Sequence, residues 1–232
     1  MNVYQSSRRS GWNANMDVKN NSGDVKMLKI WGRKNSINVQ KVLWACDEMG
    51  VPWERIDAGM AFGVNNTPEF LAMNPNGLVP VINDNGFILW ESHAILRYLA
   101  RKHGMGTLWP SDPQVAARAD QWLDWYHCTL FPDMRPIFVN LVRTPAEKRN
   151  MQEVEARRKL VVNSMKILDH LLSRQLYVAG DTFSMGDIPL GLATFRWYNM
   201  DVERPPTPNI DAWYERLTAR PAMKPHLELP MT

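Results

Sequence analysis

The chain has 232 residues, of which 45% are hydrophobic and 22% are charged, with a formal net charge of +3. This is the composition of a globular protein with material for one large or two small domains. Basic and acidic residues are interspersed, which argues against a nucleic-acid partner. No apolar run approaches the roughly 18 residues of a membrane span, which argues against a membrane protein.

The two cysteines, Cys46 and Cys128, lie far apart in the sequence and form no C-x-x-C pair. This excludes a disulfide scaffold and a dithiol redox motif, and it favours a reducing cytoplasm. Both cysteines fall in apolar helical patterns, so we expect buried, inert thiols. The five histidines show no metal-ligand spacing, and no metal site is expected.

Residues 1–26 are polar, rich in Asn and Ser, and without helical or strand periodicity. We expect them to be a disordered N-terminal extension or tag, with Met27 as the natural start of the folded chain.

From Met27 the predicted elements alternate between strands and helices. A strand is predicted at Leu28–Trp31, a helix at Asn35–Met49 that ends before a glycine, and a second strand at Trp53–Asp57. The helix makes a crossover connection, so these two strands should be parallel. A short helix is predicted at Pro68–Met73.

The strongest local signals follow, between Phe70 and Lys102. Asn85-Gly86 between two apolar runs predicts a hairpin, with one strand opening on Val79-Pro80 and the other at Phe87–Trp90. A helix should begin at Glu91-Ser92. The order βαβ followed by ββα is that of a thioredoxin-like domain, which we assign to residues 27–106.

The residues around this hairpin are suited to capturing a small peptide. A cis Val79–Pro80 bond would turn the backbone N–H and C=O of Val79 outward, ready to pair with an extended ligand. Ser92 can cap the following helix, whose free N–H groups bind a carboxylate, and Glu91 can accept an ammonium group. The alternative is a tight turn followed by an ordinary capped helix.

After a linker rich in Gly and Pro, the strand signals almost stop and residues 113–232 are predicted to form an all-helical domain. Capping-box patterns at Thr144–Glu147 and Ser184–Asp187 each predict a helix start. The helix after the second box is apolar nearly all round, so it should lie at the centre of a bundle. The predicted helices run from Pro113 to about Leu130, from the first capping box to Leu172, over Ile188–Tyr198, and from about Pro208 to Arg220.

A thioredoxin-like domain joined to a helical domain resembles the cytosolic glutathione transferases, and particular residues carry the resemblance. The family's N-P-x-G-x-V-P loop, with its cis-proline, is matched by Asn74–Pro80, and its Glu/Gln-Ser pair by Glu91-Ser92. The segment GDTFSMGDIPLG matches the family's capping box and following Asp. The segment WGRKNSINVQKVLWACDEMG is most similar to bacterial transferases related to the theta class, particularly the enterobacterial GstB type. The resemblance extends from Met27 to the C-terminus.

The resemblance implies an enzyme with glutathione as co-substrate and no prosthetic group. It implies that the γ-glutamyl end of glutathione binds Glu91 and Ser92, and that the cysteinyl backbone binds the loop of Leu78, Val79 and Pro80. The recognition of the glycyl carboxylate stays open.

The resemblance also implies that the thiol lies near the start of the first helix. There the theta-like pattern has a serine, which aligns with Ser36, and Asn38 is the other candidate. No Tyr or Cys occupies this region, which argues against the tyrosine-using and cysteine-using classes. An ordinary helix N-cap is the alternative role of Ser36.

The second substrate leaves weaker signals. Trp122 and Tyr126 stand at helical spacing on the helix expected to face the thiol, and Arg135 follows them. An aromatic wall suits an apolar electrophile, and an arginine suits an anionic one. Aromatic residues at this spacing also fit a helix core, so we expect at most one of Trp122 and Tyr126 to line the pocket.

The expected reaction is therefore the conjugation of activated glutathione thiolate to small electrophiles, with halide displacement as an option. The alternatives are a glutathione-dependent peroxidase or isomerase, and a non-catalytic ligand-binding or interaction module of the same fold. The set Ser36, Val79-Pro80 and Glu91-Ser92 favours the enzyme, because an interaction module does not need it. A homodimer is expected from the resemblance.

Overall fold

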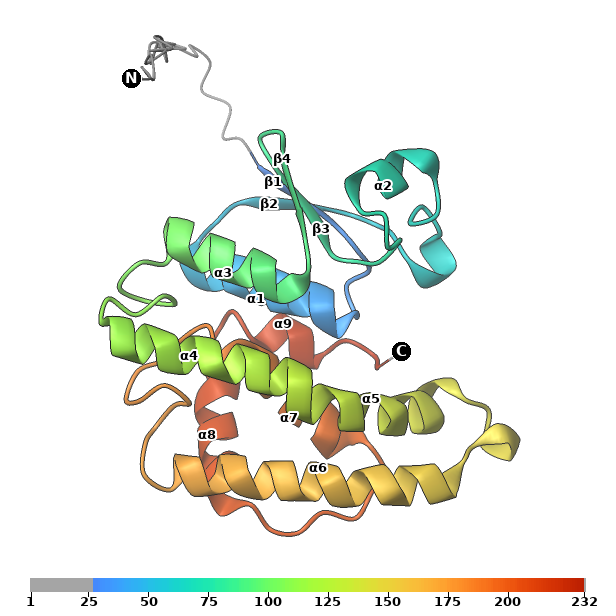
Figure 1. Ribbon diagram of the computed structural model, residues 1–232, viewed down its shortest axis with the longest axis vertical. Coiled ribbons are helices and arrows are strands. Elements are labelled where there is room, and N and C mark those ends of the chain that lie inside the picture. The colour runs from blue at the N-terminus through green and yellow to red at the C-terminus, as the bar shows by residue number, and fades with distance from the viewer. Residues whose placement is uncertain (1–26, 232) are drawn as a thin grey trace, which may run out of the picture.

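The computed structural model describes residues 27–231, and the expectations for residues 1–26 lie outside this range (Figure 1). Four strands form one sheet in the order β2-β1-β3-β4. β1 pairs in parallel with β2 and antiparallel with β3, and β3 pairs antiparallel with β4. This confirms the predicted thioredoxin-like topology. The strands are β1 (Leu28–Trp31), β2 (Trp53–Ile56), β3 (Val81–Asp84) and β4 (Phe87–Trp90).

Helices cover both faces of this sheet. Successive side chains of a strand point to opposite faces, and here each face carries apolar side chains that pack against helices. Leu28, Ile30 and Ile82 pack with α1 (Ile37–Met49) and α3 (Ser92–His103) in one core cluster. Trp31, Val81 and Ile88 point to the opposite face and pack against Phe70 of α2 (Pro68–Met73), which follows the short helix η1 (Met60–Phe62).

Helix α1 is buried on both of its sides. Val39, Val42 and Cys46 face the sheet, whereas Trp44 and Ala45 belong to the core of the helical domain. The helix ends at Gly50, whose φ of 64° is the left-handed conformation that glycine adopts at low cost.

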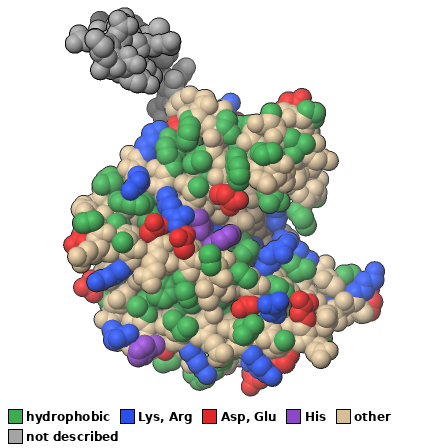
Figure 2. Space-filling model, viewed as in Figure 1, with side chains coloured by type: hydrophobic (Ala, Val, Ile, Leu, Met, Phe, Trp, Pro, Cys, Tyr) green, Lys and Arg blue, Asp and Glu red, His purple; other side chains and the backbone are tan. Residues whose placement is uncertain are grey.

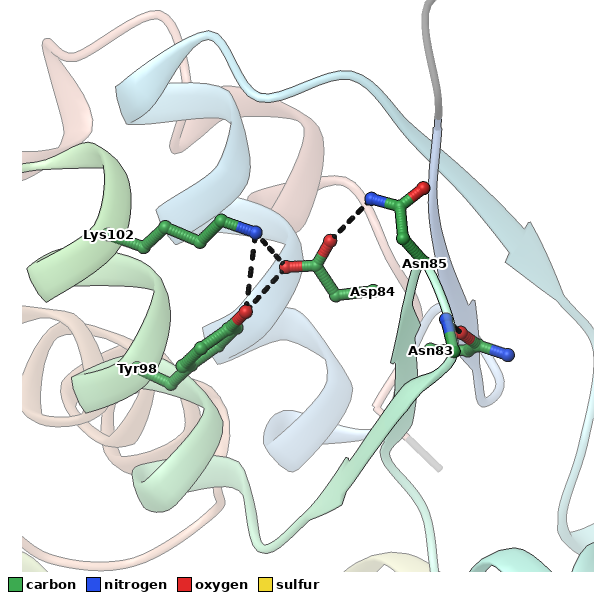
Figure 3. A network of polar contacts seen from close by, with 6 residues as sticks. Asn83, Asp84, Asn85, Tyr98 and Lys102 are labelled. Atoms are coloured by element: carbon green, nitrogen blue, oxygen red, sulfur yellow. Dashed lines mark hydrogen bonds and ion pairs between the residues drawn. The ribbon is translucent and has the colours of Figure 1, made fainter. Parts of the chain in front are cut away.

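The β3–β4 hairpin is tied to α3 by a polar network (Figure 3). Asn85 and Gly86 both have positive φ, as the predicted two-residue turn requires, and the Gly86 N–H donates to Asn83 Oδ1 at 2.7 Å. The carboxylate of Asp84 accepts hydrogen bonds from the Tyr98 hydroxyl at 2.7 Å and from the Lys102 ammonium. These contacts fix the position of α3, and therefore of Glu91 and Ser92, relative to the sheet.

The second half of the described chain is helical, as predicted (Figure 1). Helix α7 is buried along almost its whole length and lies at the centre of the bundle, which confirms the interpretation of its apolar sequence. The elements are α4 (Pro113–Trp125), η2 (Tyr126–Leu130), α5 (Phe131–Phe138), η3 (Val139–Arg143), η4 (Ala146–Lys148), α6 (Met151–Leu172), α7 (Asp187–Asn199), α8 (Pro208–Thr218) and α9 (Lys224–Leu227).

The region between α4 and α6 differs from the sequence-based prediction. The expected end near Leu130 is wrong, because the backbone stays helical to Arg143 through two π-helical turns, η2 and η3. Pro132 and Pro136 lack the N–H that an α-helix interior uses, and the wider π turns beside them accommodate that loss.

The expected capping box at Thr144–Glu147 is also wrong. The N–H and hydroxyl of Thr144 both donate to the Val139 carbonyl at 3.0 Å, so Thr144 closes the preceding helix. Helix α6 begins at Met151 instead, where Asn150 Oδ1 accepts from the Glu153 N–H at 3.0 Å. The other predicted box is present, because the Ser184 N–H and hydroxyl both donate to the Asp187 carboxylate.

Two further expectations concern burial and domain boundaries. Cys46 is buried as expected, but Cys128 is exposed, because it lies on the outer side of η2. The predicted division between residues 106 and 113 falls between α3 and α4, and it stays a prediction because both halves contribute to one large core cluster. Among residues 27–231, no helix is long and apolar enough to cross a membrane.

The buried Asp187 joins three segments of the helical domain. Its carboxylate accepts from the Val178 N–H at 3.0 Å, from the Ser184 N–H at 2.9 Å and from the Trp213 Nε1–H at 2.9 Å. Each donor is buried, so each would lose its partner if the carboxylate were removed.

We predict that Asp187→Ala lowers the free energy of unfolding by at least about 3 kcal/mol, because several buried donors are left unsatisfied. Chemical denaturation measures the effect. Asp181→Ala is the control, since Asp181 is exposed in the same loop and should change stability by less than about 0.5 kcal/mol. Equal effects of the two substitutions would show that the Asp187 network does not stabilise the domain.

Candidate active site

A cavity of about 450 Å³ lies between the two domains. Figure 2 shows basic side chains near the notch between the upper and lower parts of the molecule. The first domain lines the cavity with Arg33, Ser36, Ile37, Asn38, Gly59, Met60, Asn65, Gly77, Leu78 and Val79, and the helical domain lines it with Phe131, Met134, Arg135, Phe138, Arg143 and Arg196.

Ser36 lies at the N-cap position of α1 and lines this cavity. Its hydroxyl makes no capping hydrogen bond to the helix backbone. No acidic residue occupies the first turn of α1, and the positive end of the helix dipole therefore faces the cavity uncompensated. A serine hydroxyl at this place can donate to an anion.

The loop of Leu78 and Val79 lines the cavity beside Ser36. The Val79–Pro80 bond is cis, and Val79 precedes β3, so ladder pairing does not use its backbone. The buried Asn74 shapes the loop, because its side-chain amide donates to the Leu78 carbonyl at 2.8 Å. Pro80 is buried behind the loop and is not among the lining residues.

Gly32 allows the loop before α1 to approach Val79 closely. A Cβ atom at Gly32 would lie 2.3 Å from the Val39 Cγ2 atom and 3.3 Å from the Val79 Cβ atom, and the φ of 153° is also unfavourable for other residues. A glycine at this position is therefore required to bring the start of α1 beside the Val79 loop.

Glu91 and Ser92 stand at the start of α3, next to the cavity but not among its lining residues. The expectation that Ser92 caps the helix is wrong, because Glu91 occupies the N-cap position and Ser92 is the first helical residue. Glu91 is exposed and has a φ of 71°, a conformation that is costly for a residue with a side chain and is often found at functional sites.

The buried side chain of Lys41 connects these residues to the cavity. Its Nζ atom lies 3.0 Å from Asn38 Oδ1 and 3.5 Å from Ser92 Oγ. It also lies 3.1 Å from His93 Nε2 and 4.3 Å from the centre of the Tyr126 ring. Lys41 therefore contacts both a cavity residue, Asn38, and the Glu91-Ser92 corner.

Four arginines line the cavity, and none of the lining residues that the structure describes is acidic. We refer to Arg33, Arg135, Arg143 and Arg196 as the arginine cluster. Burial and the nearby charges of Arg143 and Arg33 lower the pKa of Arg196 to about 10. Burial and Arg135 lower the pKa of Arg143. The cluster thus concentrates positive charge that an anion would relieve.

The apolar wall of the cavity is not the expected one. Trp122 and Tyr126 are buried in the core of the helical domain and do not line the cavity. Phe131 and Phe138 take their place. Phe138 also supports the arginine cluster, because the guanidinium of Arg196 lies 4.2 Å from the centre of its ring.

The structure thus brings together Ser36, Asn38, Leu78, Val79 and Arg135, and it places Glu91 and Ser92 beside them. The sequence analysis missed Lys41 and Arg196. A usable signal was present for both, because each is a charged residue within an otherwise apolar stretch of a buried helix. Among residues 27–231, no group of His, Cys, Asp or Glu residues is placed to hold a metal ion.

The fold and the cavity can be compared with known proteins. The family model of the glutathione S-transferase N-terminal domain matches residues 26–101, and that of the C-terminal domain matches residues 130–221. The chain is 41% identical to glutathione S-transferase GstB of Escherichia coli K12 over 208 residues, which cover 89% of this chain and all of the relative. The chain belongs to the glutathione S-transferase family.

Other relatives of this transferase agree. A theta class glutathione S-transferase from Xanthomonas axonopodis pv. citri, solved with glutathione bound, superimposes with a TM-score of 0.85 at 41% identity, covering 88% of this chain and 99% of that chain. Glutathione S-transferase D6 of Drosophila melanogaster is 30% identical over 81% of this chain and 86% of its own length. These comparisons confirm the predicted family, fold and enzyme class, and the class has glutathione as its co-substrate.

Proposed function

We propose that the enzyme transfers glutathione, as a thiolate held by Ser36, to small electrophiles that carry an anionic group. The observation that carries this proposal is the arrangement of one cavity. Ser36 and the uncompensated start of α1 lie at one side of it, and the arginine cluster lies at the other with no acidic residue among the lining positions.

Glutathione is proposed to lie along the first domain. Its γ-glutamyl ammonium group meets Glu91, its γ-glutamyl carboxylate meets Ser92, and its cysteinyl backbone pairs with Val79. Leu78 and Pro80 shape this loop. Arg33 supports a site for the glycyl carboxylate, because it lines the same cavity and lies next to Gly59.

The sulfur then comes to the start of α1. A free thiol with a pKa near 8.5 is only about 3% ionised at pH 7, and a shift to about 6.5 requires roughly 2.7 kcal/mol. A hydrogen bond from the Ser36 hydroxyl to the charged sulfur supplies about 1.5–3 kcal/mol. The helix N-terminus adds about 0.3–2 kcal/mol. No general base is needed, and Asn38 is a second donor at the same end of the cavity.

We predict that the two serines of the site have separable effects. Ser36→Ala should raise the pKa of the bound thiol and lower kcat by about 10²–10³, with little change in glutathione affinity. Ser92→Ala should weaken glutathione binding and leave the pKa of the bound thiol unchanged. An ultraviolet titration of thiolate absorbance with excess protein, from about pH 5 to pH 10, measures both quantities.

Ser164→Ala is the matched control, since Ser164 is a buried serine of α6 away from the cavity. An unshifted thiol pKa in the wild-type complex would contradict the proposed activation. If the pKa of the bound thiol were lowered in Ser36→Ala as much as in the wild type, thiolate stabilisation would be assigned to Asn38 instead of Ser36.

The electrophile is proposed to enter between Phe131, Phe138 and the arginine cluster. In the reaction, the sulfur forms a bond to an electrophilic carbon. With a halogenated acid, the carbon–halogen bond breaks and halide leaves. Arg135 and Arg143 are exposed at the cavity and are placed to bind the carboxylate of such a substrate.

We predict that Arg135→Gln lowers kcat/KM for a haloacetate by about tenfold or more, because a charge-assisted hydrogen bond is lost. The rate with the matching haloacetamide, which has the same reacting carbon and no charge, should change by less than about twofold. Halide release measures both. Arg118→Gln, at an exposed arginine of α4, is the control variant. Equal losses for the acid and the amide would rule out charge recognition by Arg135.

The proposal includes a homodimer in the cytoplasm, in keeping with the family. Met60 and Phe62 of η1 support the dimer, because their side chains are exposed at 61% and 52% on a surface that the single chain leaves uncovered. Sedimentation equilibrium should give twice the mass of one chain, and Phe62→Asp should shift the population towards the mass of one chain. A monomeric wild type at micromolar concentration would contradict this part of the proposal.

A further inference from the structure

Three side-chain atoms that can accept a hydrogen bond surround the Nζ atom of Lys41. Asn38 Oδ1, His93 Nε2 and Ser92 Oγ lie 3.0, 3.1 and 3.5 Å from Nζ, and the face of Tyr126 lies 4.3 Å away. An ammonium group has three N–H donors and no acceptor, so this arrangement suits the protonated form. A neutral amine has only two N–H groups, so it could donate to only two of these three atoms.

The same position lacks an anion. Lys41 is 2% exposed, and no carboxylate among residues 27–231 lies within ion-pair distance of it. Burial and the charge of Arg196 hold the pKa of Lys41 well below its usual range, and the charge of Glu91 opposes them only in part. The titratable groups facing Lys41 are Glu91 and His93 from the start of α3, Tyr126 from η2 with His127 beside His93, and Arg196 from α7.

We propose that Lys41 is a positioning residue of the glutathione site, and that it takes up a proton when the γ-glutamyl carboxylate arrives beside Ser92. This inference rests on the proposed function, which places that carboxylate at Ser92. The ligand then supplies the missing negative charge. The proton comes from solvent and binds the Lys41 amine, whose three N–H groups then donate to Asn38, Ser92 and His93.

Lys41 is a better acceptor for this proton than its neighbour His93. Burial lowers the pKa of His93, and so do the positive charges that Lys41, His127 and Arg97 can carry. The imidazole therefore stays neutral and accepts from Lys41 through Nε2. A protonated Lys41, in contrast, can donate hydrogen bonds to atoms on three sides.

The proposal fixes the sign of the pH dependence. Because the pKa of Lys41 is higher in the complex than in the free enzyme, the complex holds more protons between the two values. Affinity for the γ-glutamyl group should therefore fall as the pH rises through this interval. Ionisation of the glutathione thiol acts in the opposite direction, so the probe must lack a free thiol.

S-methylglutathione is such a probe, because it keeps both carboxylates and the amine. Its binding is measured by titration calorimetry at about pH 6, 7 and 8, each in several buffers of different ionisation enthalpy. The slope of the observed enthalpy against the buffer enthalpy gives the number of protons exchanged. We expect net uptake of a fraction of a proton per ligand at one or more of these pH values in the wild type.

Three variants assign the proton. Lys41→Met has a similar volume and should abolish the uptake and weaken binding by roughly tenfold. Lys41→Gln keeps a donor for Asn38, so it should also abolish the uptake with a smaller loss of affinity. His93→Gln should keep the uptake. Lys166→Met, at an exposed lysine of α6, is the control and should behave like the wild type.

The outcomes separate this inference from the proposed function. No binding of S-methylglutathione by the wild type would overturn the proposed glutathione site itself. If the wild type bound S-methylglutathione but took up no proton at about pH 6, 7 or 8, the inference about Lys41 would be overturned and the glutathione site would stand. This test uses the wild type only, so it does not depend on the folding of a variant. Uptake that persists in Lys41→Met, or that is lost in His93→Gln, would assign the proton to another group and also overturn it.

Discussion

The burial of α1 on two sides is the constraint on which the rest of the structure depends. One side of the helix fills the space under the sheet, through Val39 and Val42, and the other side carries Trp44 into the core of the helical bundle. The helix therefore cannot rotate or slide without opening two cores. Its N-terminus, with Ser36, is fixed in the cavity as a result, and a site that stabilises an anion benefits from such rigidity.

Basic side chains recur throughout the site. The arginine cluster lines the cavity with no acidic residue among its lining positions, and the buried Lys41 contacts the lining residue Asn38. A buried guanidinium such as that of Arg196 lowers stability in the free protein. In the proposed function, anions that enter the cavity compensate this positive charge, and both substrates bind into a field directed at carboxylates and a thiolate.

Local patterns were enough to predict the elements whose signals lie within a few residues. The Asn85-Gly86 turn, the start of α2 at Pro68 and the capping pattern at Ser184–Asp187 are of this kind. The helical run to Arg143 was missed because prolines at 132 and 136 normally end a helix, and π turns are not visible in hydrophobic periodicity. The cavity wall was misassigned because Trp122 and Tyr126 are both buried in the core, where the Tyr126 ring faces Lys41 and His93. Lys41 and Arg196 stand out in the sequence as charged residues within apolar stretches, but their place at the site follows from the packing of α1 against α3 and α7, which no local pattern contains.

The contact between Arg196 and the loop before α1 has a consequence for how such enzymes can diversify. The Arg196 guanidinium donates to the Asn35 carbonyl at 3.2 Å, so a residue of the helical domain holds the backbone next to Ser36. Chimeric enzymes that exchange whole helical domains between relatives would therefore exchange a support of the proposed thiolate loop together with the proposed electrophile pocket. Recombination at the linker between α3 and α4 should yield functional hybrids chiefly between parents that share a basic residue at this position, whereas changes confined to α5 leave this contact with the loop intact.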